Sequence, residues 1–162
     1  MKPILNIDEV EYQKFPNGTP DTITQRYGGA IGDVARRLGA TKIGANVAVI
    51  PAGKSLLPFH NHRVNEEFLF VLEGEGVLRF GNETHPLGKG DFVLCPPGGP
   101  EVAHQLRNTG QSDMQVLEIA TKIFPDIAEY PDSGKFGVLG LTSETSRFFG
   151  RAQDTLSYWD GE

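Results

Sequence analysis

Short runs of apolar and β-branched residues recur along the middle of the chain, and turn-forming residues separate them. Runs of this kind, rich in valine, isoleucine, leucine and phenylalanine, are typical of β-strands. The clearest predicted strands are residues 43–50, 67–72, 76–80, 91–95 and 115–120. Strands of this length at close intervals favour a barrel or a sandwich. The pattern therefore predicts an all-β fold.

The turns between these runs carry many glycines. The chain has 20 glycines and 11 prolines, spread evenly rather than gathered in one linker. The segment 73–76 (EGEG) has glycines at positions where a tight turn would need a positive φ angle. We therefore expect it to join two consecutive strands.

Both ends of the chain differ from this pattern. Before the barrel, only residues 31–38 (IGDVARRL) appear helical, with Gly39 as the stop. From residue 123 onward there is no sustained period, yet the segment is rich in aromatic residues, as a disordered tail seldom is. We expect an ordered C-terminal arm that packs on its own barrel or on a partner subunit, with the partner favoured.

Composition narrows the organisation and the function. A chain of 162 residues suits one domain, with a barrel core at about 43–120, an N-terminal extension at 1–42 and the arm at 121–162. The formal net charge of −6 argues against nucleic acid as a partner, because nucleic-acid binders usually display a clustered basic face. No apolar run is long enough to cross a bilayer, so no membrane association is expected.

The expected compartment is the cytoplasm. The first residues lack the basic end and apolar core of a signal peptide. The single cysteine, Cys95, has no intramolecular partner for a disulfide, which agrees with a reducing compartment. We expect Cys95 to be a small buried apolar residue at the end of a core strand.

Three of the four histidines fall in two compact segments, which is the strongest chemical signal in the sequence. His60 and His62 are two residues apart, so on a strand both side chains project from one face and can converge on one ion. Glu67 begins the next predicted strand, and a hairpin would return its carboxylate to the same ion. His104, in the second segment, supplies a third imidazole. His85 lies in a turn-like run and is expected to be structural or exposed.

The two segments resemble the paired motifs of the cupin superfamily. The first motif has glycine, a spacer, His-x-His, three or four residues, glutamate, six residues and glycine, and the chain matches it from Gly53 to Gly74. The second has glycine, five residues, Pro-x-Gly, a spacer, histidine, three residues and asparagine, matched from Gly90 to Asn108. The chain departs by one extra residue before His60 and by three between Gly98 and His104.

The resemblance implies a double-stranded β-helix, also called a jelly-roll barrel, with a short N-terminal helix and an extended C-terminal arm. It also implies one divalent transition metal bound by His60, His62, Glu67 and His104. Imidazole and carboxylate ligands suit Fe, Mn, Ni, Cu or Zn, and the sequence does not decide among them. Glu66 competes with Glu67 for the ligand role. We favour Glu67, because only Glu67 is followed by six residues and then glycine.

The function stays open among three hypotheses. An isomerase or epimerase acting on a small polar carbohydrate or hydroxy-carbonyl compound would need a carboxylate to move a proton, and Glu101 is the candidate catalytic residue. The alternative for Glu101 is a loop carboxylate facing water. With iron and dioxygen the same ligands would support a dioxygenase, and a module that only binds a small ligand is the third hypothesis. We expect a homodimer, because small barrels usually leave exposed strand edges.

Overall fold

The computed structural model describes residues 3–15, 21–143 and 146–162. In chain order the elements are η1 (Ile7–Glu9), β1 (Gln13–Phe15), α1 (Asp21–Thr24), β2 (Gly29–Asp33), α2 (Val34–Leu38), β3 (Ile43–Ile50), β4 (Asn61–His62), β5 (Glu67–Glu73), β6 (Glu75–Phe80), β7 (Glu83–Gly88), β8 (Phe92–Cys95), η2 (Pro100–Val102), β9 (His104–Asn108), β10 (Met114–Thr121), β11 (Asp126–Tyr130), β12 (Lys135–Leu139), β13 (Arg147–Arg151) and η3 (Ala152–Asp154). No described helix has the length and apolar character needed to span a membrane.

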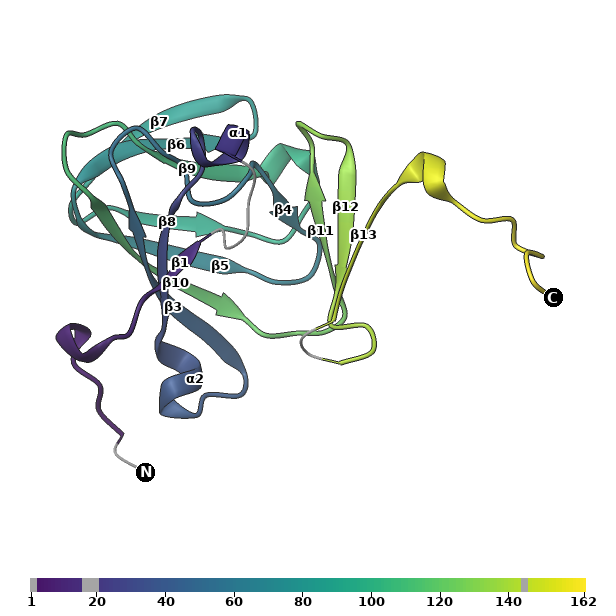
Figure 1. The fold of residues 1–162 in the computed structure, drawn as a ribbon, viewed down its shortest axis with the longest axis horizontal. Coiled ribbons are helices and arrows are strands. Elements are labelled where there is room, and N and C mark those ends of the chain that lie inside the picture. The colour runs from purple at the N-terminus through teal and green to yellow at the C-terminus, as the bar shows by residue number, and fades with distance from the viewer. Residues whose placement is uncertain (1–2, 16–20, 144–145) are drawn as a thin grey trace.

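The strands form three antiparallel sheets. A six-stranded sheet has the order β1-β2-β3-β10-β5-β8, and a three-stranded sheet has the order β7-β6-β9. These two sheets enclose one barrel, and the third sheet, β13-β12-β11-β4, stands at one end of it (Figure 1). Strands distant in sequence lie beside each other, as β10 does between β3 and β5. This is the jelly-roll fold that the sequence predicted.

The hydrophobic core fills the space between the two barrel sheets. One sheet contributes alternate residues such as Ile50, Val71 and Val116, and the other contributes Leu78 and Leu106. Successive inward side chains are two residues apart, as strand geometry requires. The remaining members of the cluster are Ala48, Leu56, Leu69, Leu87, Val93, Cys95 and Met114. Cys95 is buried, as expected.

The turn between β5 and β6 shows why one glycine of the first motif is needed. Gly74 has φ +85°, a left-handed conformation that other residues rarely adopt. A Cβ atom there would lie 2.8 Å from the Cα atom of Met114. Any larger residue at position 74 would therefore strain the turn and push β10 away from it.

The five predicted strands are all present, within one residue at each end, but other elements were missed. The prediction of a helix over 31–38 was half wrong: β2 ends at Asp33, and α2 occupies only Val34–Leu38. Ile31 pairs with Ala48 on β3 and packs against the core, so tertiary contacts take the first residues into the sheet. Asp33 caps the helix by accepting a hydrogen bond from the Arg36 amide, and Gly39 ends it with φ +77°.

The region around His85 was also interpreted wrongly. It was expected to be a turn, but it lies in β7, which pairs along its length with β6. His85 itself is exposed and lies 3.2 Å from the carboxylate of Glu83, which agrees with its expected lack of a role in the site.

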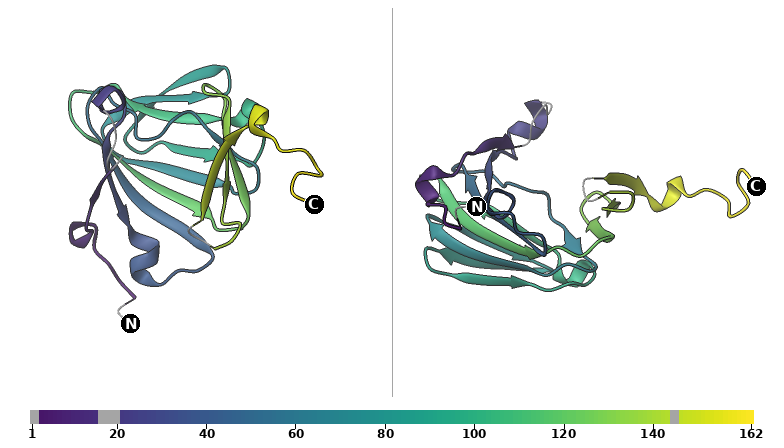
Figure 2. Two further views of the ribbon diagram at one scale, coloured as in Figure 1. Left: turned by 45° about the vertical axis from the view of Figure 1, so that its right-hand side comes forward. Right: turned by 90° about the horizontal axis from the view of Figure 1, so that it is seen from below.

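The C-terminal arm consists of two parts. Its strands β11–β13 form a sheet that joins the barrel through β4, where Ala128 pairs with His62 and Glu129 with Asn61. This part therefore packs on its own barrel, which the sequence analysis had considered but had favoured less than packing on a partner subunit. Beyond β13, residues 152–162 are exposed and extend away from the barrel (Figure 2).

Candidate metal centre

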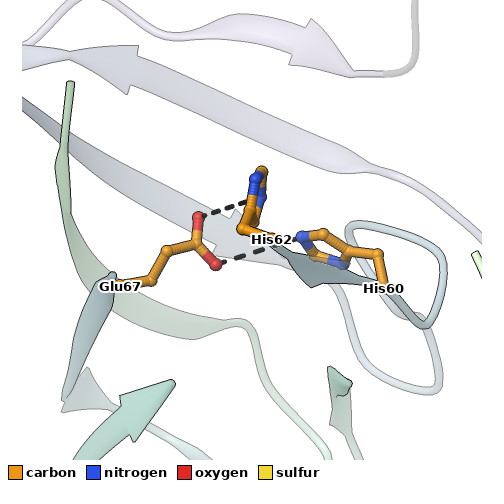
Figure 3. Close-up of side chains that lie close together, drawn as sticks. All are labelled: His60, His62 and Glu67. Carbon is orange, nitrogen blue, oxygen red and sulfur yellow. Dashed lines mark ion pairs between the residues drawn. The ribbon is translucent and has the colours of Figure 1, made fainter. Parts of the chain in front are cut away.

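The side chains of His60, His62 and Glu67 converge at the end of the barrel where β4 and β5 begin. Figure 3 shows the Glu67 carboxylate facing the two imidazole rings. Its Oε2 atom lies 4.0 Å from Nε2 of His60, and its Oε1 atom lies 3.7 Å from Nε2 of His62. One donor atom from each of the three residues lies within 4.8 Å of the other two. The spacing rule that placed both histidines on one face is therefore confirmed.

His104 reaches the same carboxylate from β9. Its backbone forms a two-way bridge with His60: each amide donates to the carbonyl of the other, at 3.1 and 2.7 Å. This bridge sets the two ring centroids 4.7 Å apart. Nε2 of His104 donates a hydrogen bond of 2.8 Å to Oε2 of Glu67. The carboxylate thus faces all three imidazoles that the motifs predicted.

The outer nitrogens of two histidines are held by fixed acceptors. Nδ1 of His60 donates to the Pro58 carbonyl at 2.8 Å, and Nδ1 of His62 donates to Oδ2 of Asp126 at 2.6 Å. Because a carbonyl or ionised carboxylate only accepts, the proton of each ring resides on Nδ1 when the ring is neutral. The Nε2 lone pairs of His60 and His62 therefore point toward Glu67, which is the arrangement that a metal ligand requires.

Asp126 is a site residue that sequence reasoning missed. It is the first residue of β11, is 1% exposed, and also accepts hydrogen bonds from Asn65 Nδ2 and the Val64 amide. It thereby ties the loop between β4 and β5 to the arm. No pattern in the sequence marked it, because it belongs to the non-periodic segment and reaches His62 only through the pairing of β11 with β4.

The electrostatics of the site keep His60 and Glu67 in the forms that bind metals. Burial, together with the neighbouring His104, lowers the pKa of His60 to about 4. Burial alone would raise the pKa of Glu67, but the hydrogen bond from His104 and the nearby histidines lower it to about 2. Burial lowers the pKa of His62, but its hydrogen bond to Asp126 and the negative charges of Glu67 and Asp126 together raise it more, so its net shift is upward. At neutral pH His60 offers a lone pair and Glu67 a full negative charge.

The residues present fit a divalent transition metal. Imidazole nitrogens and a carboxylate are the donors that such ions take in proteins, and the fixed Nδ1 atoms of two of the rings reduce the cost of ordering the site. The cluster of His60, His62 and Glu67 could therefore bind a metal ion.

A small cavity extends from this cluster into the barrel. It has a volume of about 40 Å³, and His60, Glu67 and His104 are among the residues that line it. That volume is about the size of one water molecule. The rest of its wall is mostly apolar, with one further carboxylate, Glu118 of β10, which sequence reasoning also missed. The apolar members are Ile50, Leu56, Leu57, Leu69 and Leu106.

The two other carboxylates considered from the sequence lie elsewhere. Glu66 is exposed, so the site selects Glu67, as the glycine spacing indicated. Glu101 is exposed in η2, and its Oε1 atom accepts a hydrogen bond of 2.8 Å from the Gly99 amide. That backbone hydrogen bonding lowers the pKa of Glu101. Glu101 is not one of the residues that line the cavity.

Comparison with known proteins agrees with this geometry. Residues 46–120 match the family model described as the cupin domain. Over 70 residues the chain is 34% identical to an uncharacterized protein of Methanocaldococcus jannaschii, a match covering 43% of this chain and 53% of that protein. The chain spans about 53–63% of the length of the curated relatives that it matches.

Two solved structures match nearly the whole chain. A sugar phosphate isomerase of the cupin superfamily from Silicibacter pomeroyi superposes with a TM-score of 0.80 at 22% identity, covering 98% of both chains. A protein from Acidithiobacillus ferrooxidans, proposed to be a sugar phosphate isomerase, gives 0.76 at 22% identity over 96% of both. Identity at this level shows a common fold. Residues 46–120 are therefore a cupin domain, and the whole chain shares the fold of these two structures.

Proposed function

We propose that His60, His62, Glu67 and His104 bind one divalent transition metal, and that this centre acts on a small polar carbohydrate or hydroxy-carbonyl compound as an isomerase or epimerase. The observation that carries the proposal is the convergence of three imidazoles on one ionised carboxylate, with the Nδ1 atoms of His60 and His62 already bound to acceptors. The substrate class is supported by the names of the two solved structures that share the fold.

The chain's own residues have separate tasks in this function. A bound cation would supply a positive charge that polarises a carbonyl group. Glu67 must then give up its hydrogen bond with His104. The Nε2 atom of His104 loses its proton, and its lone pair becomes available to bind the metal. The arm positions His62 through Asp126, and a mostly apolar cavity borders the inner side of the site.

The first experiment is elemental analysis of the protein purified without chelator. We expect about one equivalent of iron, manganese, nickel or zinc per chain, lost in the His60→Ala/His104→Ala double variant. The matched control is His85→Ala, which removes the exposed histidine of β7 and should leave the metal content unchanged. Metal absent from the wild type even after loading would contradict the proposal.

The identity of the metal and the consumption of oxygen separate the isomerase from its alternatives. The same ligands support iron-dependent dioxygenase chemistry, so the iron-loaded protein is tested for oxygen uptake beside isomerisation of sugar phosphates. Oxygen uptake without isomerisation would favour the dioxygenase. Ligand binding with neither reaction would favour a module that only binds its ligand.

We also propose a homodimer. Two exposed apolar regions support it: Phe68, Phe92 and Leu94 on the outer face of β5 and β8, and Tyr158 and Trp159 in the arm, which are 86% and 74% exposed. Contiguous exposed apolar surface often marks an interface. Size-exclusion chromatography with light scattering should give twice the chain mass of 17.7 kDa. A monomer at micromolar concentration would overturn this proposal.

A further inference from the structure

One carboxylate inside the barrel has no part in the site as described so far. Glu118 lies on β10 with Leu69 of β5 opposite it on one side and Asn46 of β3 on the other. Side chains two residues apart on a strand point to the same face, and Val116 and Met114, two and four residues before Glu118, are in the core. The Glu118 side chain therefore points into the barrel. Glu118 lines the same cavity as His60, Glu67 and His104.

The carboxylate of Glu118 differs from the other acidic groups near the site in its lack of partners. Glu67 is hydrogen-bonded to His104, and Asp126 to His62, Asn65 and the Val64 amide. Within the described part of the chain, the Glu118 side chain makes no hydrogen bond or ion pair. A polar group in a mostly apolar cavity is costly unless something fills its hydrogen-bonding capacity.

The nearest candidates to fill that capacity are a water or a ligand in the cavity. Asn46 of β3 and Leu69 of β5 flank Glu118 in the sheet, and Gln105 of β9 lines the cavity with its Nε2 atom donating to the Leu57 carbonyl. The described residues that line the cavity include no lysine or arginine. The ionisable groups that bear on it are Glu67 and, from β8, Cys95. A water or ligand group in the cavity can therefore form hydrogen bonds with both Glu118 and the residues of the metal centre.

We propose that Glu118 is the acid–base residue of the metal centre, exchanging a proton through the cavity with a hydroxy-carbonyl compound bound at His60, Glu67 and His104. This inference rests on the proposed function and assigns the proton transfer to the barrel interior instead of to Glu101 on the surface. The carboxylic acid form donates a hydrogen bond to the ligand, and the carboxylate form accepts a proton from it.

The reaction balances without any further reactant. The Glu118 carboxylate takes a proton from the one water molecule that the cavity has room for, and that water takes the proton from the carbon that bears the hydroxyl group. The C–H electron pair forms a C=C bond as the carbonyl oxygen becomes negative. The hydroxyl proton passes from one oxygen to the other. Glu118 then returns its proton through the same water to the neighbouring carbon, which restores a carbonyl group at the new position and leaves Glu118 as it began.

The environment of Glu118 suits this role. Burial, reinforced by the negative charge of Glu67, raises its pKa to about 8. An acid–base group works best when its pKa lies near the operating pH, because both protonation states are then populated. Glu101, whose pKa is lowered by backbone hydrogen bonds, lacks this property.

The test uses the manganese-loaded full chain with dihydroxyacetone phosphate in D₂O, where proton exchange puts deuterium on carbon and is followed by NMR. We expect Glu118→Gln to slow exchange by about 100-fold or more, the usual contribution of a positioned acid–base group. Its manganese content should stay at the wild-type level. Glu118→Asp keeps a carboxylate and should retain part of the exchange.

Two variants serve as controls. Glu66→Gln removes an exposed carboxylate next to the site and should exchange at the wild-type rate, while Glu101→Gln tests the rival assignment. Wild-type exchange in Glu118→Gln, or a loss in Glu101→Gln alone, would overturn the proposal.

A second measurement needs no substrate. Infrared difference spectra between the wild type and Glu118→Gln, with ¹³C-labelled glutamate, should show a protonated carboxylic acid at pH 6, where an ordinary glutamate is ionised. Its absence would overturn the proposal. If that band is present and the wild type does not exchange deuterium, Glu118 still holds a proton as proposed, and the substrate class of the proposed function is what fails.

Discussion

The interior of the barrel has two ends that share the same strands but differ in chemistry. On β5 the inward residues run from Glu67 at the site to Leu69 and Val71 in the core, and on β10 they run from Glu118 back to Val116. Since β5 and β10 are antiparallel, the start of one lies beside the end of the other. The polar residues of both strands therefore meet at one end of the barrel.

The two ends are also held together differently. The apolar end depends on close packing of side chains from the two barrel sheets. The polar end depends on hydrogen bonds to segments outside the barrel, chiefly Asp126 and Glu129 of β11, which bind His62 and Asn61. The comparison suggests that substitutions at one end should change stability, while substitutions at the other end should change metal binding.

The largest expected effect is the loss of metal binding in Glu67→Gln. The variant keeps the size of the side chain but removes the negative charge that faces three imidazoles. We expect affinity for Mn²⁺ or Zn²⁺ to fall by more than about 100-fold, since loss of a residue that only orients a ligand already costs about 10–100-fold. Isothermal titration calorimetry measures it, with Glu66→Gln as the control. Equal affinity in both variants would remove Glu67 from the site.

The opposite behaviour is expected at the apolar end. Met114→Ala empties a fully buried position in β10 that does not line the cavity, and should lower the free energy of unfolding by about 2–5 kcal/mol. Metal content per folded chain should not change. Urea denaturation of the metal-free protein measures the loss, and Ile43→Ala serves as control because Ile43, on the neighbouring strand β3, is 47% exposed. A similar loss in both variants would contradict the division between the ends.

Asp126→Asn should have a moderate effect on metal binding. The variant weakens the hold on Nδ1 of His62 without changing the ligands, so we expect about a 10–100-fold lower affinity. The control is Asp132→Asn, which loses an exposed ion pair with Arg79 and should bind normally. Unchanged affinity in Asp126→Asn would show that the arm does not position His62.

The same variant should change how stability depends on pH. Burial raises the pKa of Asp126, but the hydrogen bonds from His62, Asn65 and the Val64 amide, with the charge of His62, together lower it more, so its folded pKa lies below the ordinary 3.8. Its contribution to stability is present above pH 3.8 and is lost as the pH falls through the folded value. Asp126→Asn should therefore lose less stability on acidification than the wild type does. Acid unfolding curves followed by circular dichroism measure this difference.

The smallest expected effect is the pH dependence of stability caused by Glu118. Its pKa is raised, whereas the pKa of Asp126 is lowered. Because the pKa of Glu118 rises from 4.5 to about 8, the folded protein keeps a proton that the unfolded chain loses. Stability therefore falls as the pH rises from 4.5 to 8, and Glu118→Gln removes this dependence. In the metal-free protein we expect the variant to gain a few degrees in melting temperature at pH 8 relative to pH 5. Equal shifts in Glu66→Gln would contradict the assignment to Glu118.

The sequence predicted the strands and the convergence of the histidines on Glu67 well because both depend on local patterns. Residues 43–50 were predicted as a strand with the bounds that the structure has, and the spacing of His60, His62 and Glu67 follows from strand geometry. The helix over 31–38 was half wrong because the sheet recruits Ile31 through its pairing with Ala48. Local preference cannot detect a partner strand that begins a dozen residues later.

Local sequence patterns therefore indicated the fold class, the cupin-like motifs and the residues that converge at the candidate site. The tertiary structure alone decided which other groups support them. Asp126 reaches His62 because β11 pairs with β4, and Glu118 enters the cavity because β10 lies between β3 and β5. Both carboxylates come from segments more than 50 residues after the first histidines, and only the folded sheets bring them within reach of the site.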